Sequence, residues 1–392
     1  MATKQQNGLV IDCNSHVYEP ETIWDRYVPQ EYRVPVRSAF WHSVDAESGL
    51  ITVVLNGKSA RPMTRSRIIR QAIWRPGMSL DDIGSLDPNQ PHPINPGAQD
   101  PDARIKDLDA IGIRHAVVFP TLFLEYLPVV ENPDMARVLA AAYNDWVWDF
   151  CNVHPDRLIP AAILPMQDVA LAMKEARRAA ARKFKAVVIR PSFYEGRFLN
   201  HQYYNELWKE LDRLNLAVFL HPSSGSTNPE WTSEGSYVDR IAGNLKIGHY
   251  IAESIAPMMD NSLLLVAFCF YAHLEEYPKL RIAFTNSGAS WVPLALEKAE
   301  TRLALNRIPD VSLEPEHVWE DRGTSMAVFH AWESSVLRQH EHFAKYAAFG
   351  SGYPFHDTAT PAEARDNIQK YAVPADAAAR LMSGNAVRFL GL

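Results

Sequence analysis

The chain has 392 residues, of which 47% are hydrophobic and 22% charged, and its formal net charge is −7 at pH 7. This length and composition suffice for one large buried core. The acidic balance argues against nucleic acid and anionic membranes as partners, and no apolar run reaches the roughly 20 residues of a membrane span.

The N-terminus and the cysteines indicate the compartment. The first eight residues are polar and lack the apolar core of a signal peptide. The three cysteines, Cys13, Cys151 and Cys269, lie far apart and show no metal-binding or redox spacing. Because isolated thiols suit a reducing environment, we expect a cytoplasmic protein.

Short apolar segments alternate with amphipathic ones, the pattern typical of repeated βα units. The predicted strands are residues 9–13, 115–119, 158–164, 186–189, 217–220, 281–285, 326–329 and 347–350. Helices are predicted at residues 131–152, 169–182 and 203–214, where apolar positions recur three and four residues apart. Eight such strands predict an α/β fold, a (β/α)8 TIM barrel.

Residues 32–101, after the first predicted strand, do not fit this repeat. Within them an apolar segment, residues 50–55, precedes Asn56-Gly57, which is a strong signal for a tight hairpin. Residues 223–243 form a second, polar excursion after the fifth strand. Because loops at the C-terminal face of a barrel often shape the substrate pocket, we expect residues 32–101 to be an insertion that covers the barrel mouth. The whole chain, residues 1–392, is predicted to be one domain.

Three predicted strands end in residues that bear on chemistry. His16 follows the first strand, His221 follows the fifth, and Gly352 stands just beyond the eighth. Side chains at these positions point into a shared cup in a TIM barrel. Imidazoles from different strands can therefore meet there, as ligands of one metal or as acid and base groups.

Further motifs follow in a fixed order along nearly the whole chain. They include Asp12-x-x-x-His16-x-x-Glu19-Pro20, Arg104-Ile-Lys-Asp107-Leu-Asp109, His154-Pro-Asp-Arg157, Ile163-Leu-Pro-Met-Gln-Asp168, His221-Pro222, Trp291-Val-Pro293, Ser351-Gly-Tyr-Pro354 and Gly384-Asn-Ala386. In this order the chain resembles the amidohydrolase-2 family, in its branch of metal-dependent decarboxylases like aminocarboxymuconate semialdehyde decarboxylase. The resemblance implies a TIM barrel that acts on a carboxylic acid or carboxyl derivative as a hydrolase or as a decarboxylase or other lyase.

The resemblance also implies where a metal would bind. The family has His-x-His or acid-x-His on the first strand, His after the fifth, His or Glu after the sixth, and Asp after the eighth. The corresponding residues here are Asn14 and His16, His221, Asn286, and Gly352. Two imidazoles remain, and the set contains no carboxylate. A divalent cation needs an anionic ligand to offset the free energy that it loses when it leaves water. Since the family's last Asp also transfers protons, Gly352 removes a base as well as a ligand.

Other residues offer replacements for these ligands. His330 ends the seventh predicted strand, Glu19 lies shortly after His16, and Asp357 follows the eighth strand. A set of four ligands, made of His16, His221, His330 and one of these carboxylates, would satisfy the ligand count of zinc or iron. A rewired divalent metal site and a lost one are both compatible with these residues.

Each candidate also has a structural interpretation. His16 and His221 can be satisfied pocket histidines, and His330 can be a polar strand end without function. Glu19-Pro20 can simply start the following helix. Asn14 can cap a loop through its side-chain amide.

Arg190 follows the fourth predicted strand, where a guanidinium can bind a substrate carboxylate with two hydrogen bonds. Pairing with Glu195 is the structural alternative. The candidate catalytic residues are therefore His16, His221, Arg190 and His330. The candidate metal ligands are His16, His221, His330 and Glu19.

Three functions follow from these residues. The first is an amidohydrolase-like enzyme that acts on a small carboxylate with a rewired or lost metal site. The second is a non-heme iron oxygenase of a natural-product pathway, by analogy of fold and because three histidines suit iron. The third is a non-catalytic subunit that pairs with an intact homologue, because several catalytic positions are missing together. Family habit implies a homodimer, and the third function a hetero-oligomer.

Overall fold

The structure is a computed structural model that describes residues 8–44, 51–60, 72–87, 90, 92–223, 237–243, 245–308 and 310–392. Eight parallel strands follow one another in chain order around a barrel. They are β1 (Ile11–His16), β5 (His115–Phe119), β6 (Leu158–Ile163), β7 (Ala186–Ile189), β8 (Ala217–Leu220), β9 (Arg281–Phe284), β10 (Ser325–Phe329) and β11 (Ala347–Phe349). The predicted TIM barrel is confirmed, and each of the eight predicted strands is present.

The barrel closes just beyond the end of β11, where that segment lies beside β1. The Gly352 amide donates to the Asn14 carbonyl at 2.8 Å, and the His16 amide donates to the Tyr353 carbonyl at 2.7 Å. Gly350 is required here because a Cβ atom would lie 2.4 Å from Val328 Cγ1 and 2.7 Å from Asn14 Cβ. The closure therefore places Gly352, just beyond β11, beside Asn14 and His16 of β1.

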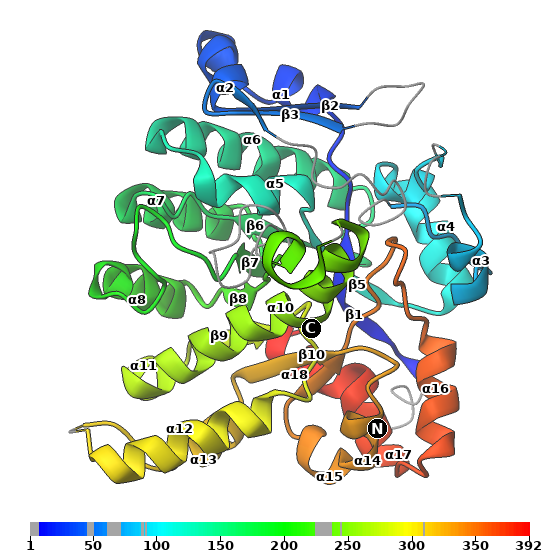
Figure 1. Ribbon diagram of the computed structural model, residues 1–392, viewed down its shortest axis with the longest axis vertical. Coiled ribbons are helices and arrows are strands. Elements are labelled where there is room, and N and C mark those ends of the chain that lie inside the picture. Colours follow the sequence, from blue (N-terminus) through cyan, green and yellow to red (C-terminus); the bar gives the residue numbers. More distant parts are fainter. Residues whose placement is uncertain are drawn as a thin grey trace.

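Helices surround the barrel on the outside, and α6, α7 and α8 lie side by side along one flank (Figure 1). The longer helices are α4 (Pro101–Ile111), α6 (Pro133–Cys151), α7 (Val169–Ala181), α8 (Asn205–Leu214), α10 (Leu245–Phe270), α12 (Val292–Asn306) and α16 (Pro361–Lys370). Shorter ones are α1 (Thr22–Arg26), α2 (Arg33–Ala39), α3 (Leu80–Gly84), α5 (Leu122–Tyr126), α11 (His273–Glu276), α13 (Pro315–Asp321), α14 (Ser334–Arg338), α15 (His340–Phe343), α17 (Ala375–Ala379) and α18 (Asn385–Leu390). The three predicted helices correspond to α6, α7 and α8.

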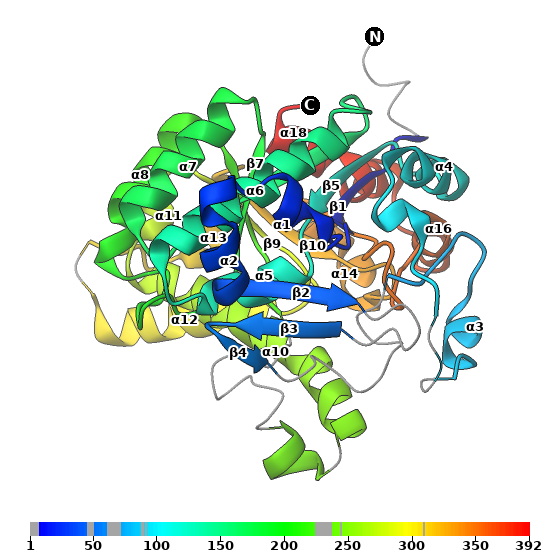
Figure 2. The same ribbon diagram turned by 90° about the horizontal axis from the view of Figure 1, so that it is seen from above.

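The chain between β1 and β5 contains a small antiparallel sheet outside the barrel, made of β2 (Phe40–Val44), β3 (Ile51–Leu55) and β4 (Lys58–Ala60) (Figure 2). Its predicted tight turn is present, since Asn56 and Gly57 have φ of 49° and 76°. The ring of Phe40 packs 5.6 Å from Phe123 and 5.7 Å from Tyr126 on α5. This sheet therefore supports the helix that follows β5.

Parts of both predicted excursions lie outside the described residues, namely 45–50, 61–71, 88–89 and 91 of the first and 224–236 of the second. Within the described part, Trp74 and residues 77–80 line a cavity of about 310 Å³ together with residues that follow β11. That residues 32–101 cover the barrel mouth, within one domain, stays a prediction.

Helix α10 was not predicted from the sequence. Its segment Tyr250–Phe270 is long and apolar enough to cross a membrane by length and composition alone, although Glu253 and Asp260 interrupt its apolar residues. Leu264, Leu265 and Phe268 are buried in the main hydrophobic core. Because the same residues pack on the barrel, α10 behaves as a core helix of the fold.

Candidate functional site

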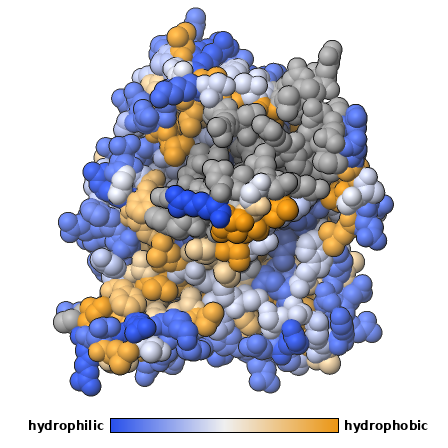
Figure 3. Space-filling view, viewed as in Figure 1, coloured by the Kyte–Doolittle hydropathy of each residue, from blue (hydrophilic) through white to orange (hydrophobic). Residues whose placement is uncertain are grey.

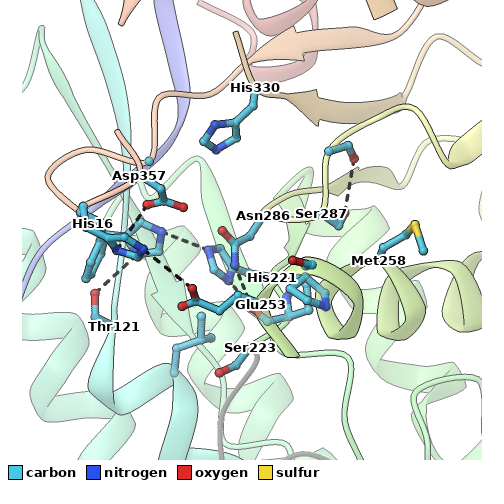
Figure 4. A pocket seen from close by; sticks show the side chains of 18 of the residues that line it. His16, Thr121, His221, Ser223, Glu253, Met258, Asn286, Ser287, His330 and Asp357 are labelled. Carbon is cyan, nitrogen blue, oxygen red and sulfur yellow. Dashed lines mark hydrogen bonds and ion pairs between the residues drawn. The ribbon is translucent and has the colours of Figure 1, made fainter. Parts of the chain in front are cut away.

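A cavity of about 610 Å³ opens at the C-terminal ends of the barrel strands (Figure 4). Segments after β1, β5, β8, β9, β10 and β11 contribute to it, and α10 forms a further wall. The histidine and acidic residues that line it are His16, Glu125, His221, Glu253, His330, Glu333, His356 and Asp357. His16, His221 and His330, which the sequence places at strand ends, all line this cavity.

His16 and His221 meet at the buried end of this cavity. Their Nε2 atoms are 3.1 Å apart, and both side chains are almost fully buried. The Nδ1 of His16 lies 3.1 Å from the Pro120 carbonyl, and the Nδ1 of His221 lies 2.9 Å from the Pro222 carbonyl. Since a carbonyl only accepts, each Nδ1 carries the proton, and the two Nε2 lone pairs face each other.

Two facing lone pairs repel unless a proton or a metal ion lies between them. Burial lowers the pKa of His221 to about 4 and, with His221 nearby, lowers that of His16 well below its ordinary value. Around neutral pH the pair is therefore uncharged. Neutral imidazoles with fixed Nδ1 protons are the form in which histidine binds a metal.

The donors at this point fit one side of a divalent metal site. Two nitrogens bonded to one ion at 2.0–2.1 Å lie roughly 2.9 to 3.4 Å apart in octahedral or tetrahedral geometry, and the Nε2 separation is 3.1 Å. The Asn14 Oδ1 lies 3.3 Å from the His16 Nε2 and adds an amide oxygen. With two imidazoles and an amide but no carboxylate, such a site would hold its ion weakly.

The other predicted ligands do not join this pair. In the described residues, the one group of three His, Cys, Asp or Glu residues with ligand atoms within 4.8 Å of one another is Glu316, Glu320 and His342, outside the cavity. The Glu19 carboxylate instead accepts hydrogen bonds from the amides of residues 121–123 at 2.8–3.2 Å, where α5 begins. The structure thus does not assemble the set of three histidines and a carboxylate, nor the three histidines proposed for iron.

Arg190 lies behind the cavity wall. Its Nη1 donates to the Glu125 carbonyl at 2.6 Å and lies 3.7 Å from the Glu125 Oε2, and both side chains are almost fully buried. Glu125 lines the cavity and also accepts a hydrogen bond from the Ser223 hydroxyl. The partner of Arg190 is therefore Glu125 on α5, where the sequence analysis had considered Glu195.

A second group of titratable residues lines the same cavity as the histidine pair. Asp357 and His356 follow β11, His330 follows β10, and Glu253 comes from α10 (Figure 4). The His356 imidazole has its Nε2 3.8 Å from a Glu253 oxygen and its Nδ1 4.0 Å from Asp357 Oδ1. His330 is thus brought to the same cavity as His16 and His221.

Glu253, Glu125 and Glu333 were missed by the sequence analysis. Glu333 accepts hydrogen bonds from the backbone amides of Ala289, Ser290 and His330 at 2.9–3.1 Å, so it holds together the loops after β9 and β10. Of the three, only Glu253 lies on an element that an apolar pattern could have revealed, because α10 is a long apolar segment.

Comparisons with known proteins agree with this barrel. A 2-amino-3-carboxymuconate-6-semialdehyde decarboxylase from Dictyostelium discoideum is 23% identical over 312 residues, which cover 76% of this chain and 79% of that protein. The crystal structure of an amidohydrolase from Mycobacterium avium subsp. paratuberculosis K-10 matches with a TM-score of 0.76 and 19% identity over 98% of both chains.

A third relative, 5-carboxyvanillate decarboxylase from Novosphingobium aromaticivorans, was solved with manganese and 4-hydroxy-3-methoxy-5-nitrobenzoic acid. It matches with a TM-score of 0.64 and 18% identity, over 99% of this chain and 97% of that chain. The two solved structures support the fold. The family model described as "Amidohydrolase" matches residues 86–392, well over half of the sequence, and the chain therefore belongs to the amidohydrolase family.

Proposed function

We propose that the protein is a decarboxylase that removes the carboxyl group of a small aromatic carboxylic acid. The observation that carries this proposal is the pair of buried imidazoles, His16 and His221, whose Nε2 atoms converge at the end of the cavity. Two of the similar proteins, a 2-amino-3-carboxymuconate-6-semialdehyde decarboxylase and a 5-carboxyvanillate decarboxylase, support decarboxylation over hydrolysis.

The shape and lining of the cavity suit an aromatic acid. Its volume of about 610 Å³ lies within the range of small-molecule sites. Leu124, Met258, Trp332 and Phe355 line it with apolar surface, and the Phe355 ring lies 5.2 Å from His16 in an edge-to-face contact. An aromatic ring can pack on these side chains with its carboxyl group near the histidine pair.

The charges of the cavity indicate why a metal would matter. None of the described residues that line it is Lys or Arg, whereas Glu125, Glu253, Glu333 and Asp357 are carboxylates. An anionic substrate would meet no permanent positive charge on these residues. Asn14, His16 and His221 would hold a divalent ion, which supplies that charge and polarises the bound carboxylate or phenol oxygen.

The proposal is tested with protein purified without chelator. We expect release of CO2 from 5-carboxyvanillate or 2,6-dihydroxybenzoate once Mn²⁺, Zn²⁺ or Fe²⁺ is added, and loss of that activity in EDTA. Elemental analysis is expected to find less than one ion per chain before addition, because the site lacks a carboxylate. If neither acid is decarboxylated with any of the three ions, the proposed function is rejected.

The histidine pair gives the first prediction. We expect His16→Ala and His221→Ala each to abolish decarboxylation and metal uptake, with a small change in melting temperature, because metal and substrate bind through Nε2 atoms that support little else. His317→Gln is the matched control, since His317 is exposed on α13. A large drop in melting temperature with unchanged metal uptake would mark the pair as structural.

The compartment and assembly are also proposals. All three cysteines are buried free thiols, which supports a cytoplasmic location. A homodimer follows the habit of the family, and pairing with an intact homologue is the alternative assembly. Co-purification from the native source, followed by mass determination of each chain, separates the two.

A further inference from the structure

Gly352 lines the cavity at a point where the side chains of His330 and Asp357 lie within contact distance of its Cβ position. The residue has φ of +77°, and a Cβ atom built on it would lie 3.5 Å from the Cε1 of His330, 3.7 Å from its Nε2 and 3.7 Å from the Oδ1 of Asp357. His330 comes from the end of β10 and Asp357 from the loop after β11. An imidazole and a carboxylate oxygen from separate loops therefore both lie within contact distance of the Cβ position of residue 352.

This point lies beside the histidine pair. Gly352 donates its amide hydrogen to the carbonyl of Asn14, two residues before His16 in β1. His16, His330, Gly352 and Asp357 all line the same cavity, and Figure 4 shows the three side chains on neighbouring walls. A substrate whose carboxyl group binds at His16 and His221 would thus place adjacent atoms near the space over Gly352.

The surroundings suit proton transfer. The amide of His330 donates to Glu333 at 2.9 Å, which fixes the backbone of that loop. The Asp357 side chain is 51% exposed and has His356 at 4.0 Å. The exposure of Asp357 gives water access to this part of the cavity, so that a proton can be replaced after each turnover.

We propose, on the basis of the decarboxylase function above, that His330 is the acid that protonates the substrate carbon and that Asp357 stabilises its imidazolium form. The bond between the carboxyl carbon and the ring carbon breaks, and its electron pair stays on the ring carbon. That carbon takes the proton of the His330 imidazolium, CO2 leaves, and water returns a proton to His330. No oxidant or reductant is required.

The test measures two reactions that share this proton transfer. The first is CO2 release from 5-carboxyvanillate, and the second is exchange of the vanillate ring hydrogen at carbon 5 for deuterium in D2O, followed by NMR. General acid catalysis is worth roughly 100- to 10,000-fold. We expect His330→Gln to slow both reactions at least 100-fold with little change in KM, and Asp357→Asn to slow both about tenfold.

Restoring an acid at residue 352 provides a rescue experiment. Adding Gly352→Asp to the His330→Gln variant is expected to raise both rates at least tenfold above those of His330→Gln alone. The substitution is possible because a Cβ atom fits there at ordinary contact distances. Gly352→Asn is the matched variant without an acid, and both residues tolerate positive φ better than most. If neither variant folds, the kinetics of the single variants decide.

The outcomes separate this assignment from the proposed function. His317→Gln and Asp376→Asn, both exposed outside the cavity, are expected to leave both rates unchanged. His330→Gln with rates within threefold of the unaltered protein, or equal rescue by Gly352→Asn and Gly352→Asp, overturns the assignment while decarboxylation stands. Absence of both reactions in the unaltered protein overturns decarboxylation of this acid and the assignment with it.

Discussion

At the residue scale, several buried histidines depend on being neutral. His42 accepts a hydrogen bond from the Trp24 indole at 3.2 Å and lies 3.0 Å from the Glu19 carbonyl, so one ring nitrogen accepts and the other donates. Protonation would break the bond from Trp24. Burial lowers the pKa of His42 to about 4, as it does for His221.

This arrangement predicts that acid weakens the fold. An unfolded histidine titrates near 6.5, so between pH 6.5 and 4 the unfolded chain binds more protons than the folded one. The free energy of unfolding therefore falls as pH falls through this window, by about 2 kcal/mol for His42 between pH 7 and 5. His42→Gln keeps one acceptor and one donor without titrating. Between pH 7 and 5, we expect the free energy of unfolding of this variant to fall by about 2 kcal/mol less than that of the unaltered protein. Urea unfolding in EDTA measures this difference.

His317→Gln serves as the comparison for that experiment, since His317 lies exposed on α13. It is expected to leave the pH dependence unchanged. An identical pH dependence for His42→Gln and the unaltered protein would show that His42 does not contribute to the acid sensitivity.

At the element scale, Arg190 at the end of β7 holds α5 through Glu125. Both partners are almost fully buried, and removing one partner of a buried ion pair typically costs about 3–5 kcal/mol. We expect Arg190→Met to lower the free energy of unfolding by that order. The double variant Arg190→Met with Glu125→Gln should recover at least half of the loss, because the buried carboxylate charge is then removed together with the guanidinium charge. Urea unfolding measures both values.

The same variants decide the role that the sequence suggested for Arg190. Binding of a substrate carboxylate would raise KM in Arg190→Met and leave stability unchanged. A loss of stability with unchanged KM is the result expected from the contact with Glu125.

The elements also differ in how well the sequence predicts them. The barrel strands are short apolar runs with almost all residues buried, and parallel strands covered by helices require that pattern. The helix α10 is different: it is apolar on several faces and contains Pro257, so neither amphipathic spacing nor end signals mark it. Because Glu253 lies on α10, one wall of the cavity was missed with it.

At the scale of the whole molecule, the sequence predicts which residues reach one cavity better than it predicts the contacts between them. His16, His221 and His330 end strands of one barrel, and that topology alone brings them to one cavity. Which of them touch depends on loop geometry: His16 reaches His221, whereas Glu19 turns to the amides at the start of α5. Such choices depend on contacts between residues about 100 or 200 positions apart, which no local pattern encodes.

The apolar surface of α10 and α12 supports the expected homodimer. Figure 3 shows apolar side chains gathered on the face that α10 crosses, and Tyr250, Leu263 and Leu294 are each 44–58% exposed. Contiguous exposed apolar surface typically marks an interaction site. We expect the protein to run at twice its chain mass of 44.2 kDa in light scattering, and Leu263→Glu with Leu294→Glu to shift it toward the monomer. Leu80→Glu, on an equally exposed leucine of α3, is the control, and a monomeric unaltered protein would contradict the dimer.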